Sequence, residues 1–204
     1  MLKKTSNLVI VIFIILIASL YRAFIIPGND GITANFSPLW AIAFFAGAQI
    51  ASTKFRYTIP LMVLFLSDIF LYMNYANGSS SALFYPGWIW VYGSILISVY
   101  IGSLLSQKIT LMWLVFGATS VSVCQWLMSD LGYFLSGGIN IMTQKPYSPD
   151  LQGLLQCFIM GFPFFKKTLA ATIFFSFLLF RKFCPKLFLG INIIKFFLQI
   201  SLHK

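Results

Sequence analysis

Carboxylates are the most informative side chains in this chain, because only 9% of its residues are charged and 59% are hydrophobic. Asp68 and Asp130 each follow a serine inside an apolar stretch, in LFLSDIFLYM and WLMSDLGYFL. A carboxylate in such a segment needs a polar cavity, a cation or hydrogen-bond donors, because burying an unpaired charge is costly. These residues therefore predict either a ligand-binding cavity or internal pairing with Lys and Arg.

The Ser-Asp pattern recurs at an offset of 62 residues. Tyr85 lies 17 residues after Asp68, and Tyr147 lies 17 residues after Asp130. Each Tyr begins the next apolar segment. The pattern predicts a parallel internal repeat that places both Asp residues at similar membrane depth, although so short an identity also fits chance.

We expect a cavity on the outer side of a membrane that binds a small solute. Its charged groups would orient the ligand, and aromatic side chains near it could stack on a flat molecule. In the alternative interpretation, each Asp only neutralises a neighbouring basic residue and no ligand binds. The candidate substrate-binding residues are Asp68, Asp130, Arg22, Tyr85 and Lys166.

No catalytic residue, metal site or cofactor is predicted. The chain has no Glu, its single His is His203, and its three Cys form no C-x-x-C pair. It also lacks G-x-S-x-G, a Walker loop and H-E-x-x-H. The sequence therefore predicts a protein that is not an enzyme, and a membrane enzyme acting on lipid is the least favoured interpretation.

Apolar segments of membrane-spanning length predict an all-α membrane protein with about six transmembrane helices in a single domain, 1–180. A basic amphipathic cytoplasmic tail, 181–204, would follow it. The last span is long, and Gly161 and Pro163 interrupt it, so it is either one kinked helix or a short outer helix followed by a span. The predicted spans are 7–24, 36–52, 57–73, 86–105, 109–135 and 151–180.

The distribution of basic residues predicts the orientation of the chain. With both termini in the cytoplasm, ten of the fourteen Lys and Arg residues lie on the cytoplasmic side, as membrane proteins prefer. The net charge of +10 does not indicate nucleic-acid binding, because the basic residues are scattered between apolar runs. The bilayer is the expected partner instead.

The second span carries a face of small residues, Ala43, Gly47 and Ala51. Small residues four positions apart allow two helix backbones to approach closely. This face predicts either packing inside the chain or docking against another membrane subunit.

Several stretches resemble an uncharacterised family of bacterial six-helix inner-membrane proteins, over about residues 22–180. They are NFSPLWAIAFFAGA, PLMVLFLSD, YPGWIWVYGS, SDLGYFLSG and GLLQCFIMGFPFFKKTL. The architecture in turn resembles the substrate-binding S components of energy-coupling-factor transporters. That resemblance implies a multi-pass protein of the bacterial inner (plasma) membrane, with an outer ligand site built from spans four to six and the first outer loop.

The resemblance also implies docking on a transmembrane coupling subunit that carries two ATPases. In S components the docking face lies on the first helix, whereas the small-residue face here is on the second span. The expected function is therefore a solute-binding, S-component-like transporter subunit. The alternative is a structural or assembly membrane protein with no ligand.

Overall fold

The computed structural model describes residues 17–18, 20–21, 35–75, 85, 87–105 and 110–183. Most of the predicted span 7–24, the candidate Arg22 and the tail beyond residue 183 lie outside these residues. Within them the protein is all-α, as predicted, and it has no strand beyond one isolated antiparallel bridge between Ile139 and Pro146. The named helices are α2 (Leu39–Gln49), α3 (Thr53–Tyr75), α4 (Trp88–Leu104), α5 (Leu111–Leu135) and α6 (Leu151–Phe183).

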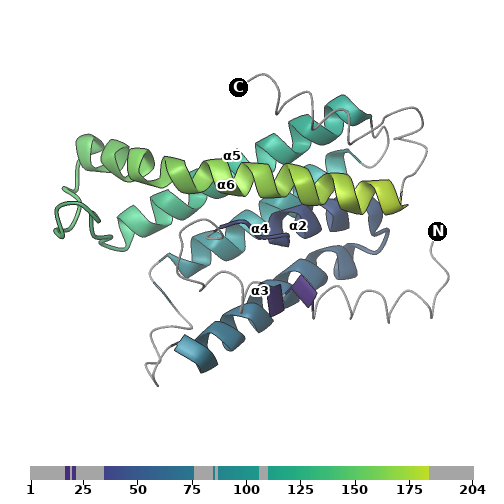
Figure 1. Ribbon diagram of the computed structural model, residues 1–204, viewed down its shortest axis with the longest axis horizontal. Coiled ribbons are helices and arrows are strands. Elements are labelled where there is room, and N and C mark those ends of the chain that lie inside the picture. The colour runs from purple at the N-terminus through teal and green to yellow at the C-terminus, as the bar shows by residue number, and fades with distance from the viewer. Residues whose placement is uncertain are drawn as a thin grey trace, which may run out of the picture.

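The helices form an elongated bundle (Figure 1). α4 packs between α2 and α5, and α6 packs against both α5 and α2. α3 lies at the edge of the bundle and contacts mainly α2. A buried apolar core, which includes Phe44, Ile95, Leu114 and Phe180, fills the space between the helices.

Three helical stretches are long and apolar enough to cross a membrane: Thr53–Met73, Leu111–Leu135 and Leu151–Arg181. At 1.5 Å per residue, a helix needs about 20 residues to cross a hydrocarbon core of about 30 Å. α2 and α4 are apolar but shorter, with 11 and 17 residues. α2 is also shorter than the predicted segment 36–52, because it begins after Pro38 and ends where Ile50 becomes extended.

Side-chain caps define where the two longest helices begin. The Thr110 hydroxyl accepts a hydrogen bond from the Trp113 amide at the start of α5. At the start of α6, Asp150 Oδ1 accepts hydrogen bonds from the Gly153 amide at 2.7 Å and from the Ser148 hydroxyl at 2.9 Å. These bonds favour the charged carboxylate and hold the pKa of Asp150 below its usual value.

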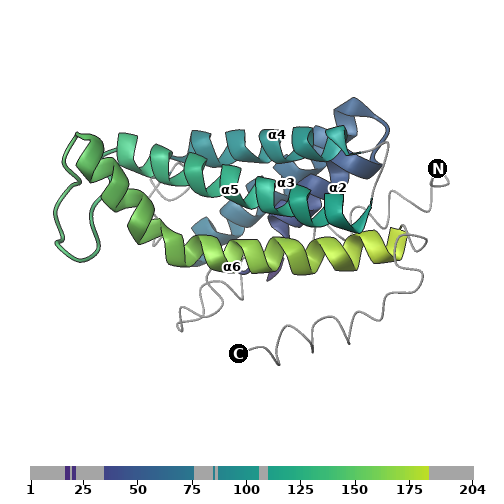
Figure 2. The same ribbon diagram turned by 90° about the horizontal axis from the view of Figure 1, so that it is seen from above.

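The sixth apolar segment is one bent helix rather than a short helix followed by a span. α6 has 33 residues and contains Pro163, whose ring nitrogen cannot donate to the carbonyl four residues earlier. Figure 2 shows the first turns of α6 inclined to the rest of the helix. The bend lies beside Gly161 and therefore shapes the wall that α6 presents to α5.

The small-residue face of the second predicted span packs inside the chain. A Cβ atom added to Gly47 would overlap the Val99 carbonyl oxygen of α4, and one added to Gly102 would overlap the Phe44 carbonyl of α2. Ala43 is fully buried, whereas Ala51 is exposed beyond the end of α2. Close backbone approach between α2 and α4 therefore accounts for Gly47, and Ala43 is buried in the core.

Candidate functional site

A pocket of about 280 Å³ opens between the beginnings of α2 and α4, the second half of α5 and the first half of α6. Polar groups and aromatic rings share its wall. The lining residues are Asn35, Ser37, Leu39, Trp40, Tyr85, Val91, Gln125, Trp126, Ser129, Asp130, Gly161, Phe164, Phe165 and Thr168.

One face of α5 supplies the polar side of the pocket. Gln125, Trp126, Ser129 and Asp130 lie within five positions of one another, so a helix brings them to one face. Gln125 Nε2 donates to Ser129 Oγ at 3.2 Å. The Ser129 hydroxyl in turn points to the Trp126 carbonyl at 3.2 Å and to Asp130 Oδ1 at 3.5 Å, and its single proton can serve only one of them at a time.

Two polar atoms at this face lack hydrogen-bond partners. Asp130 Oδ2 and Trp126 Nε1 are buried, and neither makes a hydrogen bond of good geometry, although the indole lies near the carboxylate. Buried polar atoms are nearly always paired, because an unmade bond costs about 1–3 kcal/mol. A carboxylate that lines a pocket and has unused hydrogen-bonding capacity suits a ligand that carries donors.

α6 forms the opposite wall. Gly161, Phe164, Phe165 and Thr168 have the i, i+3, i+4, i+7 spacing of a single helix face. A Cβ atom on Gly161 would overlap Asp130 Oδ2, so the glycine provides the space in which that carboxylate oxygen lies. The position of the Asp130 carboxylate thus depends on the absence of a side chain at Gly161.

An aromatic cluster joins α5 to α6 beside the pocket. The Trp126 ring lies 5.0 Å from the Phe165 ring, 5.7 Å from Phe158 and 5.8 Å from Phe162, centroid to centroid. Aromatic contacts of this kind stabilise packing beyond their buried area. They fix the orientation of the indole beside the pocket.

The structure brings together only some of the residues that the sequence suggested. Tyr85 and Asp130 both line the pocket. Lys166 does not, because it is exposed and its Nζ lies 4.9 Å above the Phe162 ring. Arg22 lies outside the described residues, and Asp68 is not among the residues that line the pocket.

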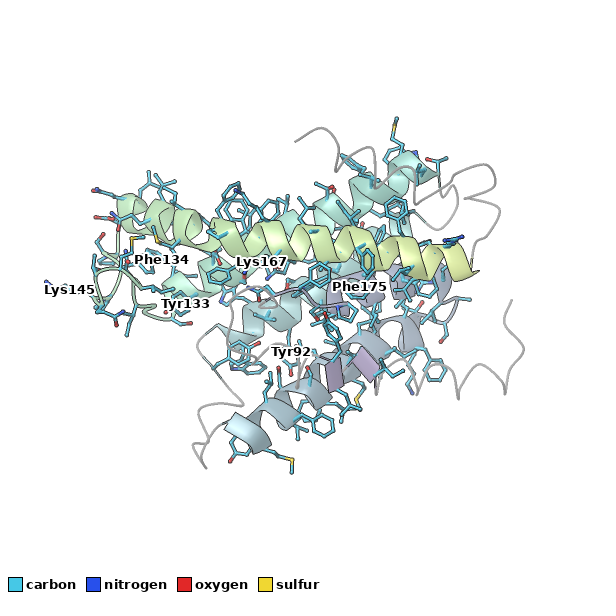
Figure 3. The ribbon with its side chains drawn as sticks, in the orientation of Figure 1. Tyr92, Tyr133, Phe134, Lys145, Lys167 and Phe175 are labelled. Atoms are coloured by element: carbon cyan, nitrogen blue, oxygen red, sulfur yellow. The ribbon has the colours of Figure 1, made fainter. Side chains whose placement is uncertain are left out.

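Asp68 has a hydrogen-bonding environment of its own on α3. Its side chain is only 3% exposed, and Oδ2 accepts a hydrogen bond from the Tyr92 hydroxyl of α4 at 3.1 Å. Figure 3 shows Tyr92 between the two helices. Tyr92 also packs edge-to-face on Trp88, with ring centroids 5.6 Å apart. The hydrogen bond between Tyr92 and Asp68 joins α3 to α4 and gives Asp68 a structural role.

Replacing Tyr92 with Phe is expected to destabilise the protein. The change removes a hydrogen bond to a buried carboxylate, which is worth about 1.5–3 kcal/mol. For a chain of this length, that corresponds to a fall in melting temperature of roughly 3–12 °C. Tyr100→Phe on the same helix is the matched control, because the Tyr100 side chain is 56% exposed. Equal melting of both variants and the wild type would refute the structural role.

The segment 136–150 between α5 and α6 adopts a defined conformation. The Tyr133 hydroxyl donates to the Ile139 carbonyl and accepts from the Ile139 amide, both at 3.1 Å. Lys145 lies at the far end of the loop, away from the helices (Figure 3). The pocket lining identified above includes no residue of this loop.

Several lining residues were not selected from the sequence. Gln125 and Thr168 are polar residues within apolar helices, which is the signal that identified Asp130. Gly161 and Phe165 share a helix face with Thr168, so a search for residues in phase with Thr168 would have found them. Trp126 follows Gln125 directly and was not singled out.

Comparison with known proteins gives one match. A family model described as "Family of unknown function (DUF6580)" matches residues 2–185. No match was found among curated proteins or among solved structures.

Proposed function

The chain belongs to this family of unknown function (DUF6580), and we propose that it is a membrane protein that binds a small solute in the pocket between α2, α4, α5 and α6. The observation that carries the proposal is Asp130, which lines that pocket and whose buried Oδ2 makes no hydrogen bond of good geometry. A carboxylate oxygen without a hydrogen-bond partner lowers the stability of an apolar helix bundle. Ionisable residues within membrane helices are often found at functional sites.

The surroundings of Asp130 favour binding over catalysis. Asp130 and Tyr85 are the titratable side chains in the described lining, and general acid–base chemistry at one centre usually needs a second group with a matched pKa. The pocket volume of about 280 Å³ lies just below the usual range for ligand sites, about 300–1,000 Å³. Both features suit retention of a small molecule.

The finer proposal is a multi-pass protein of a bacterial inner membrane, with about six spans and both termini in the cytoplasm. The apolar stretches in α3, α5 and α6 support membrane insertion. In this proposal the protein acts as an S-component-like subunit, which would deliver its solute with a coupling subunit and ATPases. The solute-sized pocket between the helices is the feature that suits such a subunit.

A structural or assembly role is the second candidate function. The Tyr92–Asp68 hydrogen bond favours it, because this bond links two helices through the buried carboxylate of Asp68. The two functions differ in what they predict for Asp130, which makes no such contact.

The test is thermal unfolding of the purified chain with and without the small molecules of yeast extract. A ligand that binds only the folded state raises the melting temperature, and one present at about 100 times its Kd contributes about 2.7 kcal/mol. That contribution corresponds to a rise of roughly 5–10 °C for a chain of this length. Unchanged melting with every solute fraction would contradict a binding function and favour the structural role.

A further inference from the structure

We propose that the solute is a small organic cation, an amine or a quaternary ammonium compound, whose positive charge lies between Asp130 Oδ2 and the aromatic wall. This inference rests on the proposed binding function and adds the chemical class of the ligand. The charge of the pocket, its aromatic side chains and its lack of a metal-ligand set each support it.

The charge of the pocket is the first argument. Asp130 is the only acidic residue in the described lining, and no described Lys or Arg lines the pocket. Lys166, on the neighbouring wall helix, lies over the Phe162 ring instead. Oδ1 of Asp130 has a weak contact with Ser129, whereas Oδ2 makes no hydrogen bond of good geometry. A cationic ligand would supply the missing counter-charge, while an anionic ligand would add a second negative charge.

The aromatic wall favours the same ligand class. Trp40, Tyr85, Trp126, Phe164 and Phe165 all line the pocket. The face of an aromatic ring carries partial negative charge and attracts cations within about 6 Å, and Trp does so most strongly. A carboxylate and several aromatic side chains in one lining therefore favour positive charge over negative charge.

Several of the remaining polar groups can accept hydrogen bonds from an ammonium ion, whereas the Trp126 indole N–H is a donor and lies near the Asp130 carboxylate instead. A primary ammonium group carries three donors and no acceptor. Besides Asp130 Oδ2, the wall offers side-chain oxygens of Asn35, Ser37 and Thr168 as acceptors. A quaternary ammonium group would rely on the carboxylate and the rings alone.

A bare metal ion fits less well. Calcium takes six to eight oxygen ligands and binds mainly through several carboxylates. Among the described residues, no group of three His, Cys, Asp or Glu side chains could hold a metal ion. The pocket also has room for a molecule much larger than one ion.

The experiment separates yeast extract by ion exchange into cationic, neutral and anionic fractions of small molecules. The melting temperature of the detergent-solubilised full chain is then measured with each fraction. The cationic fraction is expected to raise it by about 5 °C or more in the wild type, and the others much less. Asp130→Asn is expected to lose that response, and Asp150→Asn, the same chemical change at an exposed cap, is expected to keep it.

The outcomes separate this inference from the function on which it rests. Stabilisation by the neutral or anionic fraction, equal to or above that of the cationic fraction, overturns the ligand class and leaves solute binding intact. A response to the cationic fraction that persists in Asp130→Asn overturns the role of Asp130. Absence of any response to all three fractions overturns the proposed function itself.

Discussion

Asp130→Asn is expected to abolish solute binding while leaving the unliganded protein at least as stable as the wild type. Without solute, Asp130 Oδ2 makes no hydrogen bond of good geometry, so removing the charge gives up only the weak contacts of the carboxylate with Ser129 and the nearby Trp126 indole. In the complex, removing one partner of a buried charge pair costs about 2–5 kcal/mol, which weakens binding roughly 30-fold or more. Melting temperatures with and without the solute fractions measure both effects.

A merely structural Asp130 would give the opposite pattern. If the carboxylate held the fold through charge pairing, its neutralisation would lower the melting temperature of the unliganded protein. The control Asp150→Asn keeps a good helix cap, because Asn caps helices about as well as Asp. A fall of several degrees for Asp130→Asn alone, without solute, would therefore contradict the binding account.

Gly161→Ala is expected to impair the site from the opposite wall. The added methyl group would occupy the space of Asp130 Oδ2, so either the carboxylate rotates or α6 shifts away from α5. Overpacking of this kind typically costs about 1–3 kcal/mol. Because Oδ2 is displaced, loss of the solute response should accompany the lower stability.

Gly93→Ala on α4 is the matched control for this change. A Cβ atom there would meet only the flexible end of Met128, at 3.3 Å. Replacing a helical Gly with Ala removes backbone freedom from the unfolded chain and gains roughly 0.5–1 kcal/mol. Gly93→Ala should thus be neutral or stabilising and should retain the solute response. If Gly161→Ala behaves in the same way, the proposed contact between Gly161 and Asp130 is wrong.

The sequence predicted the broad architecture because composition and segment length act over many residues. An all-α fold and helices of membrane-spanning length follow from long apolar runs that contain few charges. It also predicted two lining residues, Asp130 and Tyr85. Asp130 was identifiable because a carboxylate in an apolar run is costly wherever the chain folds.

Lys166 was predicted to line the cavity because of its charge, without regard to its position around the helix. The pocket face of α6 follows the spacing Gly161, Phe164, Phe165 and Thr168, and a residue one position after Phe165 turns about 100° away from it. Lys166 therefore lies outside the lining. Helical phase is a better guide than charge in this segment.

Differences between the two Ser-Asp segments explain why Asp68 and Asp130 have different surroundings. Ser67 and Ser129 each donate to the carbonyl three residues earlier, so the local pattern does repeat. The residue 62 positions after Tyr92 is Leu154, which has no hydroxyl to donate to Asp130. The sequence pattern could not reveal this difference, because the Tyr92–Asp68 contact joins two helices and depends on their packing.

The most direct measurement is mass spectrometry of the small molecules released when the purified protein is denatured. We expect the wild type to release at least one small organic cation in near-stoichiometric amount. Asp130→Asn is expected to release at least about tenfold less of it, because the charge pair with the ligand is lost. Release of the same small molecules in the same amounts by both proteins would contradict a solute site at Asp130.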